Sequence, residues 1–470
     1  MTRSSETLRH LLLAALVVGL SAASVMLGGG KPLALAALGL LIVCWVMEAP
    51  IVGLWFTIIT QVIWLIGNYA PGGVSLLSPS KLASMLTLAA WGLWAMRHRV
   101  AVTYAPHMIP LGGFCLLVLL GPVLTPAFED SITGVGKYAM MALPYFLVAN
   151  LAVTQRWVVL TALAISVTAT LSAGLAVAEF LMPGIELQFE GVSFGAHTDA
   201  LSIDGATIKR VTGGIGDANW FSYTMATALP LCLFWFRAFP SFWWRLFSVG
   251  MAGLQLLGLV LSYTRTPLVG LAGAVVFLAW KRRIPVMPLV MVSLVGALSA
   301  PVWLPDGFLD RFFSVKYIKE GSTPMRREIY QMALTLIQER PVFGHGYQQY
   351  GPQFIKHSRT EMGLEWERRD ISGEEPAHLL RAHNLYLDIW VMHGIFGLAL
   401  ILTFYWYLMR ELAQLARHAR PWEQDLAVCL MAALIAFFLC GMGGHSQELK
   451  IFWVLAGLTA GLRRVASSPA

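Results

Sequence analysis

The chain has 470 residues, of which 57% are hydrophobic and only 13% are charged. A soluble globular domain usually carries about 25% charged residues, so this composition excludes an ordinary soluble enzyme. The net charge of +7 does not require nucleic acid as a partner, because Lys and Arg mark the cytoplasmic loops of membrane proteins. The five cysteines are scattered through apolar runs, and the sequence shows no His/Cys spacing that indicates a metal site.

Apolar runs long enough for transmembrane helices recur along the whole chain. We predict an all-α polytopic membrane protein of about twelve to fourteen transmembrane helices, forming one integral membrane domain over residues 1–470. The expected spans in the first half are Leu11–Leu27, Pro32–Val46, Ile51–Ile66, Leu82–Met96, Met108–Leu124, Tyr138–Val153 and Trp157–Phe180. Those in the second half are Trp220–Phe236, Phe247–Tyr263, Pro267–Trp280, Val286–Leu304, Leu385–Leu408, Ala427–Met442 and Ile451–Leu462.

The distribution of basic residues predicts the orientation in the membrane. If the N-terminus is cytoplasmic, every strong basic cluster in a short connection falls on the cytoplasmic side, as the positive-inside bias requires. These clusters include Arg97 and Arg99, Arg156, Arg237 and Arg245, Lys281–Arg283, Arg410, Arg417, Arg420, and Arg463 with Arg464. The same alternation places two long connections, 182–219 and 305–384, on the periplasmic side. We therefore expect an inner-membrane protein whose functional residues face the outer, periplasm-like side.

The connection 305–384 is expected to form a large periplasmic loop that contains an amphipathic helix. Within residues 324–337, apolar side chains recur at helical spacing while charged ones occupy the other faces. We expect the apolar face to lie at the membrane interface. The helix should end in the segment Glu339-Arg-Pro-Val-Phe-Gly-His-Gly, because Pro341 cannot continue a helix.

Three arginines are candidates for binding an anion on the outer side. Arg265 lies in Ser-Tyr-Thr-Arg-Thr-Pro between two apolar spans, where an outward arginine opposes the charge bias. It must either snorkel to the interface or meet an anion, and we favour an anionic ligand. Arg326 and Arg327 open the amphipathic helix, where cations oppose the positive end of the helix dipole. An anion nearby would offset that cost, although a solvated pair facing lipid headgroups is the alternative.

His383 is the candidate for proton transfer. It lies in Arg-Ala-His-Asn-Leu-Tyr-Leu-Asp, where the large loop enters a membrane helix. Partial desolvation at this depth favours the neutral imidazole, which can accept a proton. A cap or packing residue is the structural alternative. Further outer-side candidates are Lys209 and Arg210, His445 with Glu448, and the expected helix-cap residues Asp217 and Asn219.

Arginines and a histidine at the outer interface suit a lipid-linked sugar. Its diphosphate lies at headgroup depth, and its glycan extends into the aqueous loops. Guanidinium groups can stabilise the charge that develops on a leaving diphosphate, so no metal or other cofactor is needed. A general base can then activate the hydroxyl of an acceptor.

Several motifs in residues 210–400 resemble the O-antigen ligase and polymerase superfamily of bacterial membrane glycosyltransferases. The first is Ser-Tyr-Thr-Arg-Thr at 262–266, and the second is Arg326 four residues before Tyr330, in the helix that ends in Glu339-Arg-Pro-Val-Phe-Gly-His-Gly. The third is His383-Asn-Leu-Tyr-Leu, followed by Gly394 and Gly397. Each motif alone is loose, but their order, spacing and placement around one outer loop make the resemblance specific.

The resemblance implies transfer of a glycan from undecaprenyl diphosphate to an acceptor on the periplasmic face, without a metal. It implies that Arg265 and Arg326 bind the diphosphate, with Arg327 as the alternative counterpart of Arg326, and that His383 is catalytic. Arg210 resembles a further, less certain diphosphate-binding position. The acceptor stays open: an O-antigen ligase uses lipid A core, a polymerase uses a second glycan, and related enzymes glycosylate protein hydroxyls.

A flippase or other transporter of lipid-linked polysaccharide is the main rival from another functional class. Transporters tend to place ionisable groups and broken helices near the middle of the bilayer. In this chain the apolar spans are nearly free of charge, and the candidate residues gather at one interface. The sequence therefore favours a transferase, embedded in membrane lipids and without a nucleic-acid partner.

Overall fold

The computed structural model describes residues 30–63, 79–182, 206–285, 322–358, 361–372, 380–444 and 446–468, with the short pieces 188–189, 192–193, 199–203, 287, 299 and 377. Five of the described helices are long and apolar enough to cross a membrane, and four shorter apolar helices accompany them. These helices confirm the predicted all-α polytopic membrane fold.

Each expected span outside 11–27 and 286–304 coincides with a helix, and those two spans lie outside the described residues apart from 287 and 299. The helices of the first half are α2 (Gly30–Glu48), α3 (Pro50–Val62), α4 (Pro79–His98), α5 (Met108–Leu124), α6 (Phe128–Leu151) and α7 (Gln155–Leu181). Those of the second half are α8 (Ala218–Ala238), α9 (Phe242–Leu261), α10 (Thr266–Trp280), α17 (Leu385–His418), α18 (Pro421–Cys440) and α19 (Lys450–Ser467).

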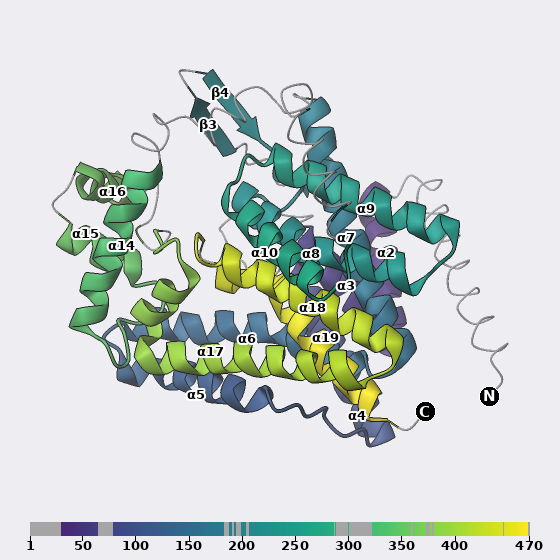
Figure 1. Ribbon diagram of the computed structural model, residues 1–470. Coiled ribbons are helices and arrows are strands. Elements are labelled where there is room, and N and C mark those ends of the chain that lie inside the picture. Colours follow the sequence, from purple (N-terminus) through teal and green to yellow (C-terminus); the bar gives the residue numbers. More distant parts are fainter. Residues whose placement is uncertain are drawn as a thin grey trace.

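Two short hairpins in the connection between α7 and α8 were not expected from the sequence. Strands β1 (Gln188–Phe189) and β2 (Val192–Ser193) form one, and β3 (Asp199–Ile203) and β4 (Ala206–Arg210) form the other. Helix α8 then begins as predicted, because the Asp217 side chain accepts a hydrogen bond from the Trp220 amide at 2.6 Å. The second hairpin projects from the helical bundle in Figure 1.

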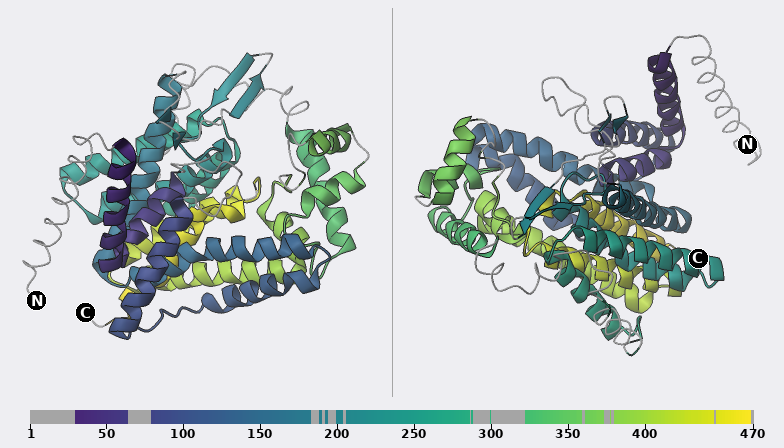
Figure 2. Two further views of the ribbon diagram at one scale, coloured as in Figure 1. Left: turned by 180° about the vertical axis from the view of Figure 1, so that it is seen from behind. Right: turned by 90° about the horizontal axis from the view of Figure 1, so that it is seen from above.

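The helices form a bundle with a smaller helical group at one end. In Figure 1 and the left view of Figure 2, α5, α6 and α17 run side by side along one edge of the molecule. Beside the ends of α6 and α17 lie three helices from the large loop, namely α14 (Ser322–Glu339), α15 (Tyr350–His357) and α16 (Glu361–Ser372).

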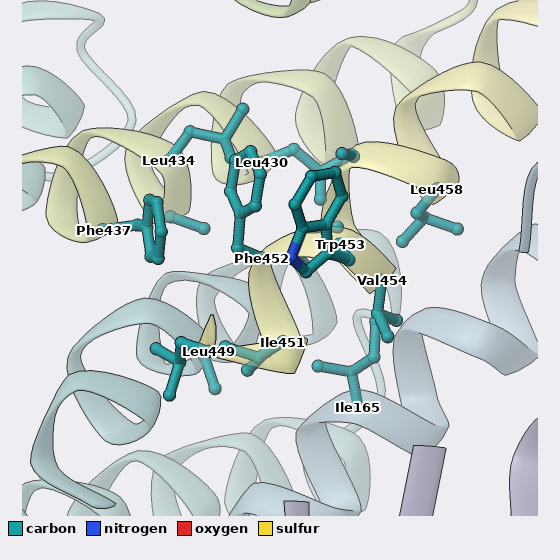
Figure 3. Packing of buried hydrophobic residues seen from close by; sticks show 14 of the residues in the cluster. Ile165, Leu430, Leu434, Phe437, Leu449, Ile451, Phe452, Trp453, Val454 and Leu458 are labelled. Carbon is teal, nitrogen blue, oxygen red and sulfur yellow. The ribbon is translucent and has the colours of Figure 1, made fainter. Parts of the chain in front are cut away.

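The centre of the bundle is packed with aromatic and branched side chains, as Figure 3 shows around the junction of α18 and α19. Phe437 and Phe452 stack with ring centroids 4.5 Å apart. The Trp453 indole nitrogen donates to the Gln447 carbonyl oxygen at 3.2 Å, which satisfies its buried N–H group. Aromatic pairs of this kind contribute about 0.5–1.5 kcal/mol beyond burial of their area. This packing fixes the start of α19 relative to the end of α18.

The amphipathic helix is present, but its apolar face packs on protein. Ile329, Ala333 and Leu336 of α14 are buried in one cluster with Phe354 of α15 and Trp366 of α16. The expectation that this face lies on the membrane interface is therefore wrong. The physical reason is that α15 and α16 follow α14 closely in the chain and supply apolar surface of their own.

The two ends of the helical bundle differ in their charged side chains. At one end, Arg237 and Arg283 both form ion pairs with Asp425, and Arg463 pairs with the buried Glu411 at 3.4 Å. The starts of α8, α10 and α17 and the end of α18 lie at the opposite end. The bundle thus has one basic end and one end where the candidate site residues gather.

Candidate functional site

A turn of three glycines and one methionine, residues 441–444, joins several segments at the end of α18; we call it the glycine turn. The Gly441 carbonyl accepts a hydrogen bond from the Leu385 amide at 2.7 Å, and the Met442 carbonyl accepts one from the Asn384 side chain at 3.1 Å. The Gly443 carbonyl accepts one from the Tyr223 hydroxyl at 3.3 Å. The turn therefore ties the start of α17 to α8.

Glycine is required in this turn because its neighbours approach the backbone closely. A Cβ atom on Gly443 would lie 2.7 Å from Cγ2 of Thr266, the first residue of α10. A Cβ atom on Gly444 would lie 2.6 Å from Cε2 of Tyr223. Both separations are shorter than real side-chain contacts, so the missing side chains allow α8 and α10 to meet at this point.

His383 is held beside the glycine turn in a left-handed backbone conformation, with φ of 46°. Such a conformation costs about 1–3 kcal/mol for a residue other than glycine and persists only where the surroundings enforce it. The amide of Ala382 on one side donates to the Asp388 carboxylate at 3.3 Å. Asn384 on the other side caps α17 through the amides of Tyr386 and Leu387. These bonds fix the backbone on both sides of a partly exposed imidazole.

Arg326 and Arg327 lie on different faces of α14. The hydroxyl of Tyr330, one helical turn after Arg326, lies 3.3 Å from the carbonyl oxygen of Met442 in the glycine turn. Residues four apart share a helix face, so Arg326 is directed toward the turn as well. It is partly buried and interacts electrostatically with the Tyr223 hydroxyl, whereas Arg327 is exposed. The structure therefore separates the two arginines that the sequence could not rank firmly.

Arg265 reaches the same region from α10. It is the N-cap residue of that helix and is partly exposed. Its neighbour Thr266 packs against Gly443 and hydrogen-bonds Tyr223. Arg265 therefore directly precedes a residue that contacts the glycine turn. Tyr223 interacts with this residue, Thr266, and with Arg326, so it connects the two arginine-bearing segments.

Arg210 is buried and already engaged with the backbone around Arg265. Its Nε donates to the Ser262 carbonyl at 2.9 Å, and its Nη2 donates to Asn219 Oδ1 at 3.0 Å and to Thr264 Oγ1 at 2.7 Å. Only 7% of Arg210 is exposed. The guanidinium group therefore joins β4, the start of α8 and the segment before Arg265, which suits a role in positioning Arg265.

A second polar cluster next to His383 contains the outer-side candidate Glu448 together with Arg381 and Tyr347, which the sequence did not single out. Arg381 Nη2 donates to Glu448 Oε1 at 3.0 Å, and the Tyr347 hydroxyl donates to the same oxygen at 3.1 Å. Burial works to lower the pKa of Arg381, but the carboxylates of Asp388 and Glu448 outweigh it and raise the pKa. Arg381 is therefore a permanent cation. The sequence offered one indication of this cation: Arg381 lies two residues before His383, just ahead of a membrane helix.

The described residues contain no group of three or more His, Cys, Asp or Glu side chains arranged to hold a metal ion. The candidate His445 and the Lys209 side chain lie outside the residues that the structure describes. In the described part of the chain, tyrosine and asparagine side chains bond the glycine turn, and the candidate arginines and histidine lie in the adjoining segments.

The fold and this cationic region define a multi-pass membrane protein with a polar site at one end of its helical bundle. Residues 250–402 match the family model described as O-antigen ligase. The matched segment runs from α9 into α17 and includes Arg265, Arg326 and His383. The match confirms the resemblance to the O-antigen ligase and polymerase superfamily, whose members are glycosyltransferase-like enzymes. No curated protein matches the chain at a significant level.

Proposed function

We propose that this protein transfers a glycan from undecaprenyl diphosphate to an acceptor hydroxyl on the periplasmic face of the inner membrane. One observation carries the proposal: the three separate segments that contain Arg265, Arg326 and His383 meet at one glycine turn, through Thr266, Tyr330 and Asn384. The segment that matches the O-antigen ligase family contains all three residues. The basic opposite end of the bundle supports a cytoplasmic location for that end, because basic residues concentrate on the cytoplasmic side.

Arg265 and Arg326 would bind the diphosphate of the donor. Tyr223 interacts electrostatically with Arg326 and bonds Thr266, the neighbour of Arg265, so this tyrosine connects the two segments that carry the arginines. A guanidinium group binds phosphate oxygens through paired N–H donors and stays charged at any physiological pH. Two such groups would stabilise the negative charge that develops on the diphosphate as it leaves the sugar.

His383 would act as the general base. Its imidazole takes the proton of the acceptor hydroxyl while the acceptor oxygen forms a bond to the anomeric carbon of the donor glycan. The bond between that carbon and the diphosphate oxygen breaks, and undecaprenyl diphosphate leaves with the bonding electrons. The constrained backbone of His383 supports this role, because a catalytic base must be held within hydrogen-bond reach of the proton it removes.

Arg327 and Arg210 receive different roles in this proposal. Arg327 is exposed on α14 and would face lipid headgroups or water. Arg210 would orient Arg265 through its bonds to Ser262 and Thr264, instead of binding the diphosphate directly. Its burial and existing hydrogen bonds support this assignment.

The acceptor that we propose is lipid A core, which makes the enzyme an O-antigen ligase. The description of the matching family supports this choice. Reconstitution with undecaprenyl-diphosphate-linked glycan and three competing acceptors tests it: lipid A core, a second lipid-linked glycan and a protein that presents hydroxyl groups. We expect glycosylated lipid A core as the main product. Extended lipid-linked glycan would instead identify a polymerase, and a glycoprotein would identify a protein O-glycosylation ligase.

The same reconstitution separates a transferase from a flippase. A transferase forms a new glycosidic bond when donor and acceptor are on the same side of the membrane. A flippase moves donor between leaflets and leaves its covalent structure unchanged. Donor translocation without any product, in the presence of all three acceptors, would overturn the proposal.

A further inference from the structure

The turn that follows α14 exposes an apolar surface. It consists of Pro341, Val342 and Phe343, which we call the loop tip. Val342 is 42% exposed and Phe343 is 39% exposed, and Pro341 is exposed as well. Contiguous apolar surface of this kind marks contact with another protein, a ligand or a membrane. The position of the loop tip in the fold decides among these partners.

The loop tip is fixed on the kink of α17. The Ile395 amide donates to the Pro341 carbonyl oxygen at 2.8 Å, and two amides after the tip donate to the carbonyl oxygens just before the kink at 2.8 and 3.1 Å. Gly394 lets the Val342 carbonyl approach so closely that a Cβ atom would collide with it. In Figure 1, the helices of the large loop accordingly lie beside the ends of α6 and α17. The loop tip therefore has a defined position at the start of residues 395–418, the part of α17 that follows the kink.

The loop tip continues an exposed apolar stripe of α17. The rings of Phe343 and Phe396 lie with centroids 5.8 Å apart, and Ile395 and Phe396 are 41% and 52% exposed. Exposed apolar side chains of α17 follow at positions 399, 402 and 406, three or four residues apart, so they share one face of the helix. Helix α17 is long and apolar enough to cross a membrane. Acyl chains are therefore the expected cover of this stripe, and the same cover is available to the tip.

The thickness of a bilayer supports contact between the tip and acyl chains. Arg410 lies at the other end of the stripe, with its guanidinium carbon 5.3 Å from the centre of the Trp406 ring. At about 1.5 Å per residue, Phe396 lies about 21 Å along the helix axis from Arg410. The hydrocarbon core is about 30 Å thick, so hydrocarbon that begins at Arg410 extends about 9 Å beyond Phe396. Tilting the helix shortens its vertical span and widens this margin.

The residues around the loop tip suit the boundary between acyl chains and headgroups. Arg340 directly precedes the tip and is exposed, so its guanidinium group can reach lipid phosphates while the apolar neighbours insert. Trp390 is partly exposed, and its indole nitrogen donates to the Pro341 carbonyl oxygen at 3.4 Å. Tryptophan is enriched at this boundary in membrane proteins. The carboxylate of Glu339 is engaged by His357 at 3.1 Å.

We infer that the loop tip inserts among the acyl chains of the bilayer and anchors the large loop to the membrane. The leaflet is the one on the side of the candidate site, with Arg340 among its phosphate groups. A second copy of the chain is the other possible cover of the tip. Lipid is favoured because the tip is continuous with a stripe of a membrane-crossing helix.

The anchor would set the depth of the candidate base. His383 precedes the part of α17 that ends at the kink, and the loop tip is bonded to that kink. A tip held in acyl chains therefore keeps His383 close to headgroup depth, where the diphosphate of a lipid-linked donor lies. This consequence rests on the proposed function, whereas the contact between tip and membrane does not.

A spin label at residue 343 tests the contact. Cys44 and Cys115, the two exposed cysteines, are first replaced by alanine, and the label is attached to Phe343→Cys in nanodiscs of phosphatidylcholine. Its collisions with O₂, which concentrates among acyl chains, are compared with its collisions with a nickel chelate, which stays in water. We expect the label at 343 to favour O₂, like a label at Trp406→Cys in the stripe. A label at Arg417→Cys, exposed in the last turn of α17, should favour the nickel chelate.

Two results would overturn the inference. A label at residue 343 that favours the nickel chelate, as at residue 417, would place the loop tip in water. A label that meets neither reagent and couples magnetically to a second label would show another copy of the chain on the tip.

Variants test whether the apolar character of the tip holds it in the membrane. Phe343→Glu introduces a charge that is costly among acyl chains, whereas Phe343→Leu keeps the tip apolar. With the spin label at Val342→Cys, we expect the glutamate variant to favour the nickel chelate and the leucine variant to favour O₂. Both variants should unfold near the wild-type temperature in detergent, because residue 343 is substantially exposed. An unchanged preference for O₂ in the glutamate variant would contradict the anchor.

Transfer kinetics connect the anchor to the reaction. Phe343→Glu should lower kcat about tenfold, since small displacements of a catalytic group are costly, and Phe343→Leu should stay near wild type. Equal turnover in the two variants would contradict the link between the anchor and His383. A membrane-embedded tip in a protein that transfers no glycan would refute the proposed function alone. A tip in water in an active transferase would refute the anchor alone.

Discussion

The hydroxyl of Tyr330 lies 3.3 Å from the carbonyl oxygen of His383, so α14 of the large loop is joined directly to the entrance of α17. The same hydroxyl lies 3.3 Å from the Met442 carbonyl oxygen. One side chain therefore connects the helix that carries Arg326, the residue proposed as base and the glycine turn. This connection explains how a soluble loop can place an arginine beside a residue at a membrane-helix entrance.

Replacing His383 by Asn should abolish the proposed base with little change in the fold. Asn tolerates the left-handed backbone conformation that His383 adopts, so the backbone need not change. We expect glycan transfer to fall about 10²- to 10⁴-fold, which is typical for loss of a general base. Measurements of product formation and unfolding temperature check this expectation. Transfer at the normal rate would remove His383 from the chemistry, and His357→Ala in α15 serves as the control.

Arg326 and Arg327 form a matched pair of test positions. Arg326→Ala should raise the donor KM or lower turnover by about ten- to a hundredfold, because charge-assisted hydrogen bonds contribute about 1.5–3 kcal/mol. Arg327→Ala, which removes the same charge one residue later from an exposed position, should have little effect. Steady-state kinetics at several donor concentrations distinguish the two. The reverse order of effects would contradict the assigned orientation of α14.

Arg265, the other arginine proposed to bind the diphosphate, is tested in the same way. Arg265→Ala should weaken donor engagement by a similar factor, since one guanidinium group is lost from the proposed diphosphate site. Direct binding of lipid-linked donor and turnover are both measured. Undiminished binding and turnover would reduce Arg265 to an arginine that snorkels toward the interface.

The helices and their ends could largely be predicted from the sequence, because hydropathy and basic connections report directly on membrane insertion. The order of motifs also predicted that arginines and a histidine would share one outer region. Their contact through the glycine turn could not be predicted. The sequence shows that glycines occupy most of residues 441–444. It does not show why glycine is required there, because the residues that approach the turn, Thr266 and Tyr223, belong to helices distant in the chain.

Partners distant in the chain account for the other features that were missed. The Arg381–Glu448 pair joins residues on opposite sides of α17 and α18, and sequence spacing carries no signal for such a pair. The apolar face of α14 had the pattern of an interfacial helix. Its real partners, including Phe354 and Trp366, lie in two further helices of the large loop, and the sequence does not show that the three helices pack against one another.

Arg210→Met should destabilise the protein more than it affects donor affinity. The substitution removes three hydrogen bonds, to the Ser262 carbonyl, Asn219 and Thr264, and costs about 1–3 kcal/mol for each buried group that stays unsatisfied. We expect a lower unfolding temperature and reduced turnover, with the donor KM changed less than in Arg265→Ala. A large rise in donor KM at normal stability would instead support direct contact between Arg210 and the diphosphate.

Transfer should persist in the presence of a chelator such as EDTA. In the proposed reaction, Arg265 and Arg326 supply the positive charge that stabilises the leaving diphosphate. Product formation is measured after chelation and again after addition of Mg²⁺ or Mn²⁺. A strict requirement for a divalent ion would contradict the proposed division of roles, since arginine alone would then be insufficient.

Gly394→Ala should disrupt the kink that leads α17 from the site into the membrane. Gly394 has φ of 67° and ψ of −170°, a conformation that is essentially restricted to glycine. An added Cβ would also collide with the Val342 carbonyl oxygen. We expect a loss of at least about 1–3 kcal/mol from backbone strain alone. Unfolding temperature and transfer should both fall, because the kink sets the direction of the helix that His383 precedes.

Gly250→Ala in α9 is the matched control: its Cβ would enter open space, so Ala should be neutral or stabilising there. Equal unfolding temperatures for the two variants would show that the kink is not enforced by the packing described here.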